Sequence, residues 1–365
     1  MKKALMVSCE GLGRGGVQAV MMGIVRQLRD EYQFDMLLFT REVRYYDEEF
    51  LSYGGKILRL PHYEGKNLLL RKLDYPCRGS RLYRRVLQVL QENGPYDVIH
   101  CNNGFESGIC VRAAQKLGIP VRISHAHVCF DQENFLRRLV NQRYLKWIEK
   151  NATCRLACTR EAGKVNFQES DFLVVGNAYD EARFDPERYP KHTKKPLLLT
   201  QIGIYGSNKN QEFSLQILQQ LCRQGVNARL ALVGFGAYKK SLEQRLGQLG
   251  LSDRVQLLEA DTDTPELLSR SAALLLPSVK EGFGIVLLEA QAMGVKCYVS
   301  DTVPRDADVG GCCFLPLAAG PQAWADRIIE DYASGQGAFQ TLDCSGFSNQ
   351  NIMKTYRRIY QGEEK

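Results

Sequence analysis

The sequence predicts an α/β protein with two doubly wound parallel-sheet domains. Short apolar runs of strand length alternate with helical segments along almost the whole chain, and parallel strands covered by helices on both faces give this pattern. A polar stretch with three prolines, residues 180–196, interrupts the alternation, which then starts again. The length of 365 residues is long for one domain and suits two.

Composition indicates an ordinary globular protein of the cytoplasm. Hydrophobic residues make up 44% of the chain and charged residues 24%, no apolar run approaches membrane-spanning length, and the start MKKALMVSCE is too short an apolar segment for a signal peptide. The 12 cysteines form no CxxC pair and no zinc-type spacing with histidine, which predicts reduced thiols and no metal site. The net charge of +7 comes without an aromatic and basic recognition motif, so no nucleic-acid partner is expected.

Strands and helices alternate through the first half. Apolar runs predict strands at residues 4–9, 34–40, 95–103, 119–128, 154–159 and 171–179, with a helix and a short strand within 46–64. Helical periodicity predicts helices at 17–28, 79–93, 106–117, 135–151 and 160–166. The helix at 79–93 is basic and amphipathic, with an apolar face that we expect to pack inward, formed by Leu82, Val86, Leu87 and Leu90.

The second half repeats the pattern. Strands are predicted at residues 197–206, 229–234, 254–260, 272–276 and 295–301. Helices are predicted at 210–224, 238–249, 265–271, 285–293 and 322–333. Gly250 and Gly294 follow two of these helices, at the position where a helix C-terminus favours glycine. A last helix, residues 349–361, follows after the second sheet is complete.

The stretch LPSVKEGFGIVLLEAQAMG, residues 276–294, predicts a ligand site. A buried strand ends here, Gly282 and Gly284 allow a tight bend, and a helix starts at Ile285. The free N–H groups and the dipole of a helix start attract an anion. We expect phosphates to bind at this start, formed by Gly282, Phe283, Gly284 and Ile285.

Two carboxylates flank this turn. Glu281 lies in the turn, and Glu289 lies between apolar residues of the helix, where a carboxylate is costly unless it is hydrogen-bonded. A structural ion pair or an exposed stripe would explain Glu289 without a ligand. The functional interpretation is that Glu289 accepts hydrogen bonds from ribose hydroxyls and that Glu281 binds a second sugar beyond the phosphates. Together these features describe a site for a sugar nucleotide.

Two glutamates eight positions apart in an EGFxxxxLEA context resemble the donor site of retaining glycosyltransferase family 4, and in particular of bacterial capsular and exopolysaccharide enzymes. The resemblance implies a GT-B fold, in which two Rossmann-like doubly wound parallel-sheet domains face a cleft. We expect an acceptor-binding domain at residues 1–180, a linker at 181–196 and a nucleotide-sugar domain at 197–345. The C-terminal helix, within 346–365, is expected to return to the first domain.

The resemblance also assigns a phosphate-binding lysine. Lys209, in IGIYGSNKN, matches the lysine that family members place on the donor diphosphate. The family usually has arginine after the strand glycine, but here Ile204 follows Gly203. Losing one charge-assisted contact costs about 1.5–3 kcal/mol unless another cation replaces it. The replacement could be Arg14, Lys280 or Arg305.

The glycine-rich loop near the N-terminus allows three interpretations. Gly11, Gly13 and Gly16 form a GxGxxG pattern that is typical of dinucleotide sites, although the second strand ends at Thr40 and Arg41 and carries its acidic residue, Asp35, near its start. The glycines could instead serve only strand-to-helix packing. In the family, a loop of this kind lies near the donor phosphates, which would assign substrate contacts to Arg14, Gly15 and Gly16.

Polar residues end two neighbouring strands of the predicted first sheet. Asn102 ends one, and His125 and His127 end the other, at the carboxyl edge where ligands of such sheets bind. Such histidines are often structural residues with satisfied hydrogen bonds. The motif SHAH resembles the family's usual SHSH, which implies a histidine near the transferred sugar. Which of His125 and His127 does this stays open.

The resemblance implies a retaining glycosyltransferase that moves a hexose from a nucleoside diphosphate sugar, most favourably a UDP-sugar, to a glycan or lipid-linked acceptor in capsule or exopolysaccharide synthesis. Its catalytic residues would be Glu281, His125, His127 and Lys209, with no metal and no cofactor. One alternative is an NAD-dependent oxidoreductase built on the GxGxxG loop. Another is a non-catalytic homologue that binds nucleotide sugars.

Two basic segments suggest where the protein meets its acceptor. They are residues 66–85, with Lys66, Arg71, Lys72, Arg78, Arg81, Arg84 and Arg85, and residues 137–150, with Arg137, Arg138, Arg143, Lys146 and Lys150. The family resemblance to enzymes that extend lipid-linked chains predicts contact with an anionic membrane surface, at the inner membrane face. Two solvated helix faces are the alternative.

Overall fold

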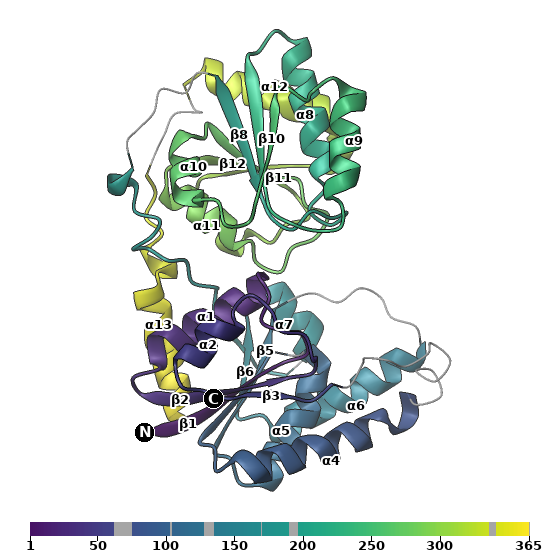
Figure 1. Ribbon diagram of the computed structural model, residues 1–365, viewed down its shortest axis with the longest axis vertical. Helices are drawn as coiled ribbons and strands as arrows, with labels where there is room; N and C mark the ends of the chain where they lie inside the picture. The colour runs from purple at the N-terminus through teal and green to yellow at the C-terminus, as the bar shows by residue number, and fades with distance from the viewer. Residues whose placement is uncertain are drawn as a thin grey trace. The chain divides into compact units, whose positions relative to one another are not determined.

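The computed structural model describes residues 1–61, 75–102, 104–127, 135–168, 170–189, 196–335 and 341–364, with the side chains of 75–78 and 135–138 left out. The chain forms two compact units (Figure 1). Unit 1 comprises Met1–Ala178 and Asn349–Lys365, and unit 2 comprises Tyr179–Ser348.

Unit 1 is built on a seven-stranded sheet in which every pair of neighbours is parallel. The strand order is β3-β2-β1-β4-β5-β6-β7, so the winding direction reverses between β1 and β4. In the first part of the sheet the strands are β1 (Lys2–Ser8), β2 (Tyr32–Leu38) and β3 (Ile57–Arg59). The others are β4 (Val98–Cys101), β5 (Val121–Ala126), β6 (Cys154–Ala157) and β7 (Leu173–Val174).

Helices cover this sheet. They are α1 (Gly16–Leu28), α2 (Asp47–Ser52), α4 (Tyr75–Asn93), α5 (Ser107–Lys116), α6 (Phe135–Asn151) and α7 (Arg160–Phe167). In Figure 1, α4, α5 and α6 lie together on one side of the sheet, and α5 packs against both of the others. The apolar face of α4 points inward as predicted, because Leu82, Val86 and Leu90 are buried.

Unit 2 has a six-stranded parallel sheet with the order β10-β9-β8-β11-β12-β13. Its strands are β8 (Leu197–Ile202), β9 (Ala228–Val233), β10 (Val255–Leu258), β11 (Ala273–Leu276), β12 (Lys296–Ser300) and β13 (Cys312–Leu315). Sequence reasoning did not predict β13. Its four residues, CCFL, are half-buried at the sheet edge, and so short an apolar run between Gly311 and Pro316 is a weak strand signal.

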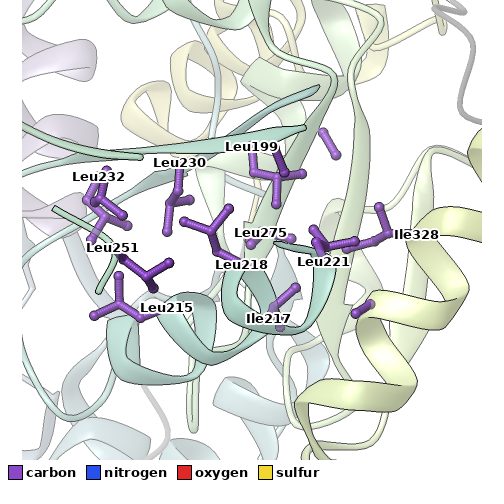
Figure 2. Close-up of a cluster of buried hydrophobic side chains, with 14 of the residues drawn as sticks. Leu199, Leu215, Ile217, Leu218, Leu221, Leu230, Leu232, Leu251, Leu275 and Ile328 are labelled. Atoms are coloured by element: carbon purple, nitrogen blue, oxygen red, sulfur yellow. The ribbon is translucent and has the colours of Figure 1, made fainter. Parts of the chain in front are cut away.

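The main core of unit 2 lies between the sheet and the helices α8 (Gln211–Arg223) and α12 (Gly320–Ala333). Figure 2 shows Leu199 and Leu275 of the sheet facing Leu218 and Leu221 of α8, with Ile328 of α12 beside them. The remaining helices are α9 (Lys239–Leu249), α10 (Thr264–Arg270) and α11 (Ile285–Ala292). The two parallel sheets confirm the predicted α/β class.

The last helix, α13 (Asn349–Gln361), belongs to unit 1. It packs against α1 and β5. Tyr356 and Tyr360 are buried in this packing, and Arg357 forms an ion pair with Glu31 at 2.7 Å. Within the described ranges, no helix combines the length and the apolar character needed to cross a bilayer.

Candidate functional site

The turn between β11 and α11 has the backbone geometry of an anion site. Gly284 adopts φ +85°, the left-handed region that favours glycine, and α11 starts directly after it. No side chain caps this helix start and no acidic residue lies in its first turn. Leu287 N donates to the carbonyl of Gly284 at 2.9 Å, so the N–H groups of Ile285 and Val286 are the ones of this turn that an anion can use.

The turn is held to two neighbouring segments. Thr302 Oγ1 donates to the carbonyl of Ser278 at 2.8 Å, and Ser300 Oγ donates to the same oxygen. Asn208 contributes two backbone-directed bonds: its carbonyl accepts from Val279 N at 2.8 Å, and its Nδ2 donates to the carbonyl of Lys280 at 2.8 Å. The loop after β8 and the end of β12 thus fix the loop that carries Glu281.

Lys209 and Glu281 form an ion pair with Nζ and Oε1 2.5 Å apart. Ser278 Oγ donates to the same Oε1 at 2.6 Å, whereas Oε2 accepts no hydrogen bond from any described residue. The lysine chain runs over Gly203, where an added Cβ would lie 3.0 Å from Lys209 Cε. Sequence analysis placed these two charges on different parts of a ligand and missed their direct contact, which spans 72 positions in the chain.

Glu289 differs from Glu281 because none of the described residues donates a hydrogen bond to its carboxylate. It is half-buried in α11. Burial raises the pKa of its carboxyl group to about 7, an effect that Arg183 opposes and Asp180 reinforces. Among the described residues, Glu289 therefore has no structural ion pair to explain it. Its environment suits a ligand that supplies hydroxyl donors.

The position of the missing arginine is apolar. Ile204 is 46% exposed after Gly203. Two of the replacement cations already stack on aromatic rings: Arg305 lies 4.1 Å from the ring of Phe314, and Arg14 lies 3.8 Å from that of Tyr45. Lys280, the third, lies in the turn itself.

The glycine loop of unit 1 leads into α1. Gly15 is the extended residue before the helix, Gly16 is its exposed first residue, and the helix start has neither a side-chain cap nor an acidic residue in its first turn. Gly11 packs closely instead, since an added Cβ would lie 3.1 Å from Arg44 Cγ. The acidic residue of the second strand, Asp35, is buried in mid-strand.

Asp35 is a structural residue. Its carboxylate lies 2.9 Å from Lys3 Nζ and accepts a hydrogen bond of 2.9 Å from Tyr96 Oη. Lys56 N donates to it as well, at 2.9 Å. The acidic residue that a dinucleotide site needs at the strand end is therefore not supplied by Asp35.

The carboxyl ends of β4 and β5 bring Asn102 together with the histidines. Asn102 Oδ1 and His127 Nε2 are 2.7 Å apart. His100, which sequence analysis missed, joins the cluster: its Nε2 lies 3.1 Å from His125 Nδ1. The sequence held a signal for His100. It lies two positions before Asn102, and residues two apart along a strand point to the same face of the sheet.

The three imidazoles are neutral at pH 7. Burial lowers the pKa of His100 and of His127 to about 3 and that of His125 well below its usual value, with neighbouring imidazoles as a lesser cause for His100 and His125. His125 Nε2 and His127 Nδ1 are buried without a hydrogen-bond partner. In the described part of the chain, no group of His, Cys, Asp and Glu side chains is placed to hold a metal ion.

Two family models match the chain. The model described as "Glycosyl transferases group 1" matches residues 183–309, and the one described as "Glycosyl transferase 4-like domain" matches residues 15–164. EpsF of Bacillus subtilis (strain 168), whose glycosyltransferase assignment is itself provisional, is 28% identical over 92% of this chain and 89% of its own length. The "UDP-Gal:alpha-D-GlcNAc-diphosphoundecaprenol alpha-1,3-galactosyltransferase" of Escherichia coli is 26% identical over 62% of this chain and 64% of its own.

Solved structures show the same fold. Anabaena Alr3699/HepE in complex with UDP gives a TM-score of 0.77 at 17% identity, over 99% of this chain and 100% of that one. The same protein in complex with UDP-glucose gives a TM-score of 0.75 at 17% identity, over 98% and 99%. With two parallel sheets in two units, this likeness confirms the GT-B fold.

Glu289 should make the stability of the free protein depend on pH. Because the folded pKa is raised above the unfolded value of about 4.5, the unfolded chain loses this proton first as pH rises. Stability is therefore lost between about pH 4.5 and 7. Glu289→Gln should gain about 1 to 3 kcal/mol over the wild type at pH 8 and nothing from this source near pH 4.5. Denaturant unfolding from pH 5 to 8 measures the difference.

Glu243→Gln is the matched control, because Glu243 is an exposed glutamate on α9 of the same unit. This substitution removes the same charge, but from an exposed position where the carboxylate is not buried. The stability of the Glu243→Gln variant should therefore follow that of the wild type at every pH. A Glu289→Gln effect that stays constant across the pH range would contradict the assignment.

Proposed function

Because the chain belongs to the group 1 glycosyltransferases of GT-B fold, with a family 4 type of donor sequence, we propose that it is a retaining hexosyltransferase that uses a UDP-sugar and extends a lipid-linked glycan. The observation that carries the proposal is the group at the start of α11. The uncapped start of α11, Glu281 just before it and the donor-free carboxylate of Glu289 lie on one short segment of unit 2, and Lys209 reaches Glu281 from the loop after β8.

Each part of this group fits one part of a nucleotide sugar. The N–H groups from Gly282 to Ile285 and the ammonium of Lys209 would bind the diphosphate. Glu289 would accept hydrogen bonds from the ribose hydroxyls. Glu281 would accept one from a hydroxyl of the transferred sugar through Oε2, while Oε1 stays with Lys209 and Ser278. Residues 197–345 would thus form the donor domain.

The choice of a UDP-sugar rests on similar proteins. HepE has been solved with UDP and with UDP-glucose, and the Escherichia coli relative is named for UDP-galactose. The GT-B fold is common to donors of several bases, so the base is the least constrained part of this proposal.

The chemistry would depend on stabilising the leaving diphosphate. Negative charge grows on its oxygen as the sugar bond breaks, and the Lys209 ammonium and the start of α11 supply fixed positive charge there. The departing oxygen would take the proton of the acceptor on the same face of the sugar, which gives retention. Because His125 and His127 are neutral, they would form hydrogen bonds with hydroxyl groups and would not supply positive charge.

The acceptor would be bound by unit 1, at residues 1–180. The name of the Escherichia coli relative specifies a diphosphoundecaprenol acceptor, which is a lipid. The described cations of the two basic segments lie on helices of one layer, α4 and α6. Arg84 and Arg85 are exposed on α4, as are Arg143, Lys146 and Lys150 on α6. Lys66, Arg71 and Lys72 lie outside the described residues, as do the side chains of Arg78, Arg137 and Arg138.

These two helices touch directly. A Cβ added at Gly79 of α4 would lie 2.7 Å from Tyr144 Oη of α6. Each exposed cation of these helices would contribute about 1 kcal/mol at an anionic surface, reduced by salt. We propose that this layer holds the protein at the inner membrane face.

A thermal-shift and calorimetric screen at pH 8 tests the donor. UDP-sugars should raise the melting temperature and be consumed with release of UDP. Glu289→Gln should weaken UDP binding by about 5- to 100-fold, because a neutral amide accepts ribose hydrogen bonds less strongly than a carboxylate. Glu243→Gln should not. Binding of UDP-sugar without any turnover would favour the non-catalytic alternative, and binding of NADH in its place would favour the oxidoreductase.

Lys209→Ala should lower kcat more than it weakens UDP-sugar binding. Its charge matters most when the phosphate bond breaks, so we expect kcat to fall about 100-fold or more and the Kd to rise less than tenfold. Lys240→Ala, which removes an exposed lysine of α9, is the control. Equal losses in Kd and in kcat/KM would place Lys209 in ground-state binding only.

Co-sedimentation with vesicles tests the membrane surface. Anionic vesicles should bind the protein at low salt and release it at high salt, and neutral vesicles should not bind it. The triple change Arg84→Gln, Arg85→Gln and Lys146→Gln should abolish binding. The control changes three exposed cations of unit 2, Arg229, Lys240 and Arg270, to Gln. No binding to anionic vesicles at low salt would rule this surface out.

A further inference from the structure

A buried chain of polar groups connects the C-terminal helix to the histidine site. Tyr360 Oη of α13 lies 3.0 Å from His100 Nδ1, and His100 Nε2 lies 3.1 Å from His125 Nδ1. Tyr360, His100 and His125 are at most 1% exposed. The last nitrogen of the chain, His125 Nε2, is buried without a partner.

The hydrogen bonds that link Tyr360, His100 and His125 can be oriented in two directions. In one, Tyr360 donates to His100, His100 Nε2–H donates to His125 Nδ1, and His125 carries its proton on Nε2. In the other, every donor is reversed and the hydroxyl proton of Tyr360 points at no acceptor. Both directions leave His125 Nε2 without a partner, as a donor in the first and as a bare acceptor in the second. The second direction also leaves the hydroxyl proton of Tyr360 without an acceptor, so the first is favoured in the free protein.

A ligand increases the preference for the first direction. The unsatisfied donor at Tyr360 would lie within the packing of Tyr32 and Phe34 against α13, where no ligand could reach it. The unsatisfied donor at His125 would lie at the carboxyl edge of the sheet, where a ligand oxygen can accept its proton. The first direction therefore becomes fully satisfied when substrate binds.

We infer that Tyr360 and His100 are positioning residues that fix His125 as the Nε2–H tautomer and hold it as a hydrogen-bond donor toward the substrate. Tyr360 would act through the imidazole of His100 and would not touch substrate. This role rests on the proposed transferase function, because only a ligand at the site gives the donor an acceptor.

His127 complements this donor. Its Nε2 lies 2.7 Å from Asn102 Oδ1, and Asn102 Nδ2 is directed at the carbonyl of Val7. Asn102 therefore accepts, His127 Nε2 carries the proton, and Nδ1 is left as a bare acceptor. The rings of His125 and His127 have centroids 3.9 Å apart. The two neighbouring rings thus offer one donor and one acceptor, which suits a hydroxyl group that accepts from His125 and donates to His127.

The tautomers can be read directly by two-bond 1H–15N NMR of the full chain labelled with 15N-histidine, with His125→Gln used to assign the signals. The wild type should show His125 as Nε2–H in the absence of any substrate. Tyr360→Phe removes the hydroxyl and keeps the ring, so the two directions should become comparable and the Nε2–H population of His125 should fall. This readout needs no turnover, so it stands or fails separately from the proposed function.

Tyr356→Phe is the matched control. Tyr356 is also buried on α13, its ring is 6.2 Å from that of His125, and its hydroxyl has no hydrogen-bond partner. It should leave the His125 signals and kcat unchanged, whereas Tyr360→Phe should lower kcat about three- to tenfold with unchanged affinity for free UDP. An Nδ1–H tautomer in the wild type, or identical His125 signals in wild type and Tyr360→Phe, would overturn the inference. The wild-type spectrum decides the direction even if a variant does not fold.

Discussion

The ion pair between Lys209 and Glu281 is the contact on which the rest of the donor site depends. It joins the loop after β8 to the loop before α11, and its parts are fixed from outside by Gly203, Ser278 and Asn208. A lysine side chain loses substantial rotamer freedom when it is held in one position. Because Glu281 already holds the ammonium, a diphosphate would meet an ordered cation and would not have to order it. The free second oxygen of Glu281 leaves that carboxylate able to bind a ligand as well.

Glu289, within α11, shows the opposite arrangement. Lys209 and Ser278 both donate to Glu281, whereas no described residue donates to the half-buried Glu289, and burial raises the pKa of its carboxyl group. A stable fold alone would favour an apolar residue here, since the neighbours Leu288 and Ala290 are fully buried. Proteins tolerate such local costs mainly at functional sites. The two glutamates of one motif thus differ in physical state: Glu281 is paired, and Glu289 has no donor among the described residues.

The sequence predicted what depends on local pattern. The helices at 135–151 and 349–361 have the predicted bounds, and the strand, glycine turn and helix around Gly284 formed as expected. Long-range partners could not be read in this way. The contact of Lys209 with Glu281 needs the loop conformation at Gly203, and the relation of His100 to Tyr360 joins residues 260 positions apart. Periodicity shows which face of a strand a residue occupies, but not which residue lies opposite to it. The half-buried strand β13 has no alternation of apolar and polar residues at all.

In the proposed function the two units would supply different interactions. Three buried imidazoles of unit 1 are neutral, so they cannot balance the charge of a diphosphate. In the proposed site, Lys209 and the uncapped start of α11 would face that charge. Neutral imidazoles are better suited to hydroxyl groups, because a neutral ring offers one donor and one acceptor whereas a cation offers only donors. Burial, which lowers the pKa of these histidines, therefore suits them to the hydroxyl groups of a sugar in the proposed function.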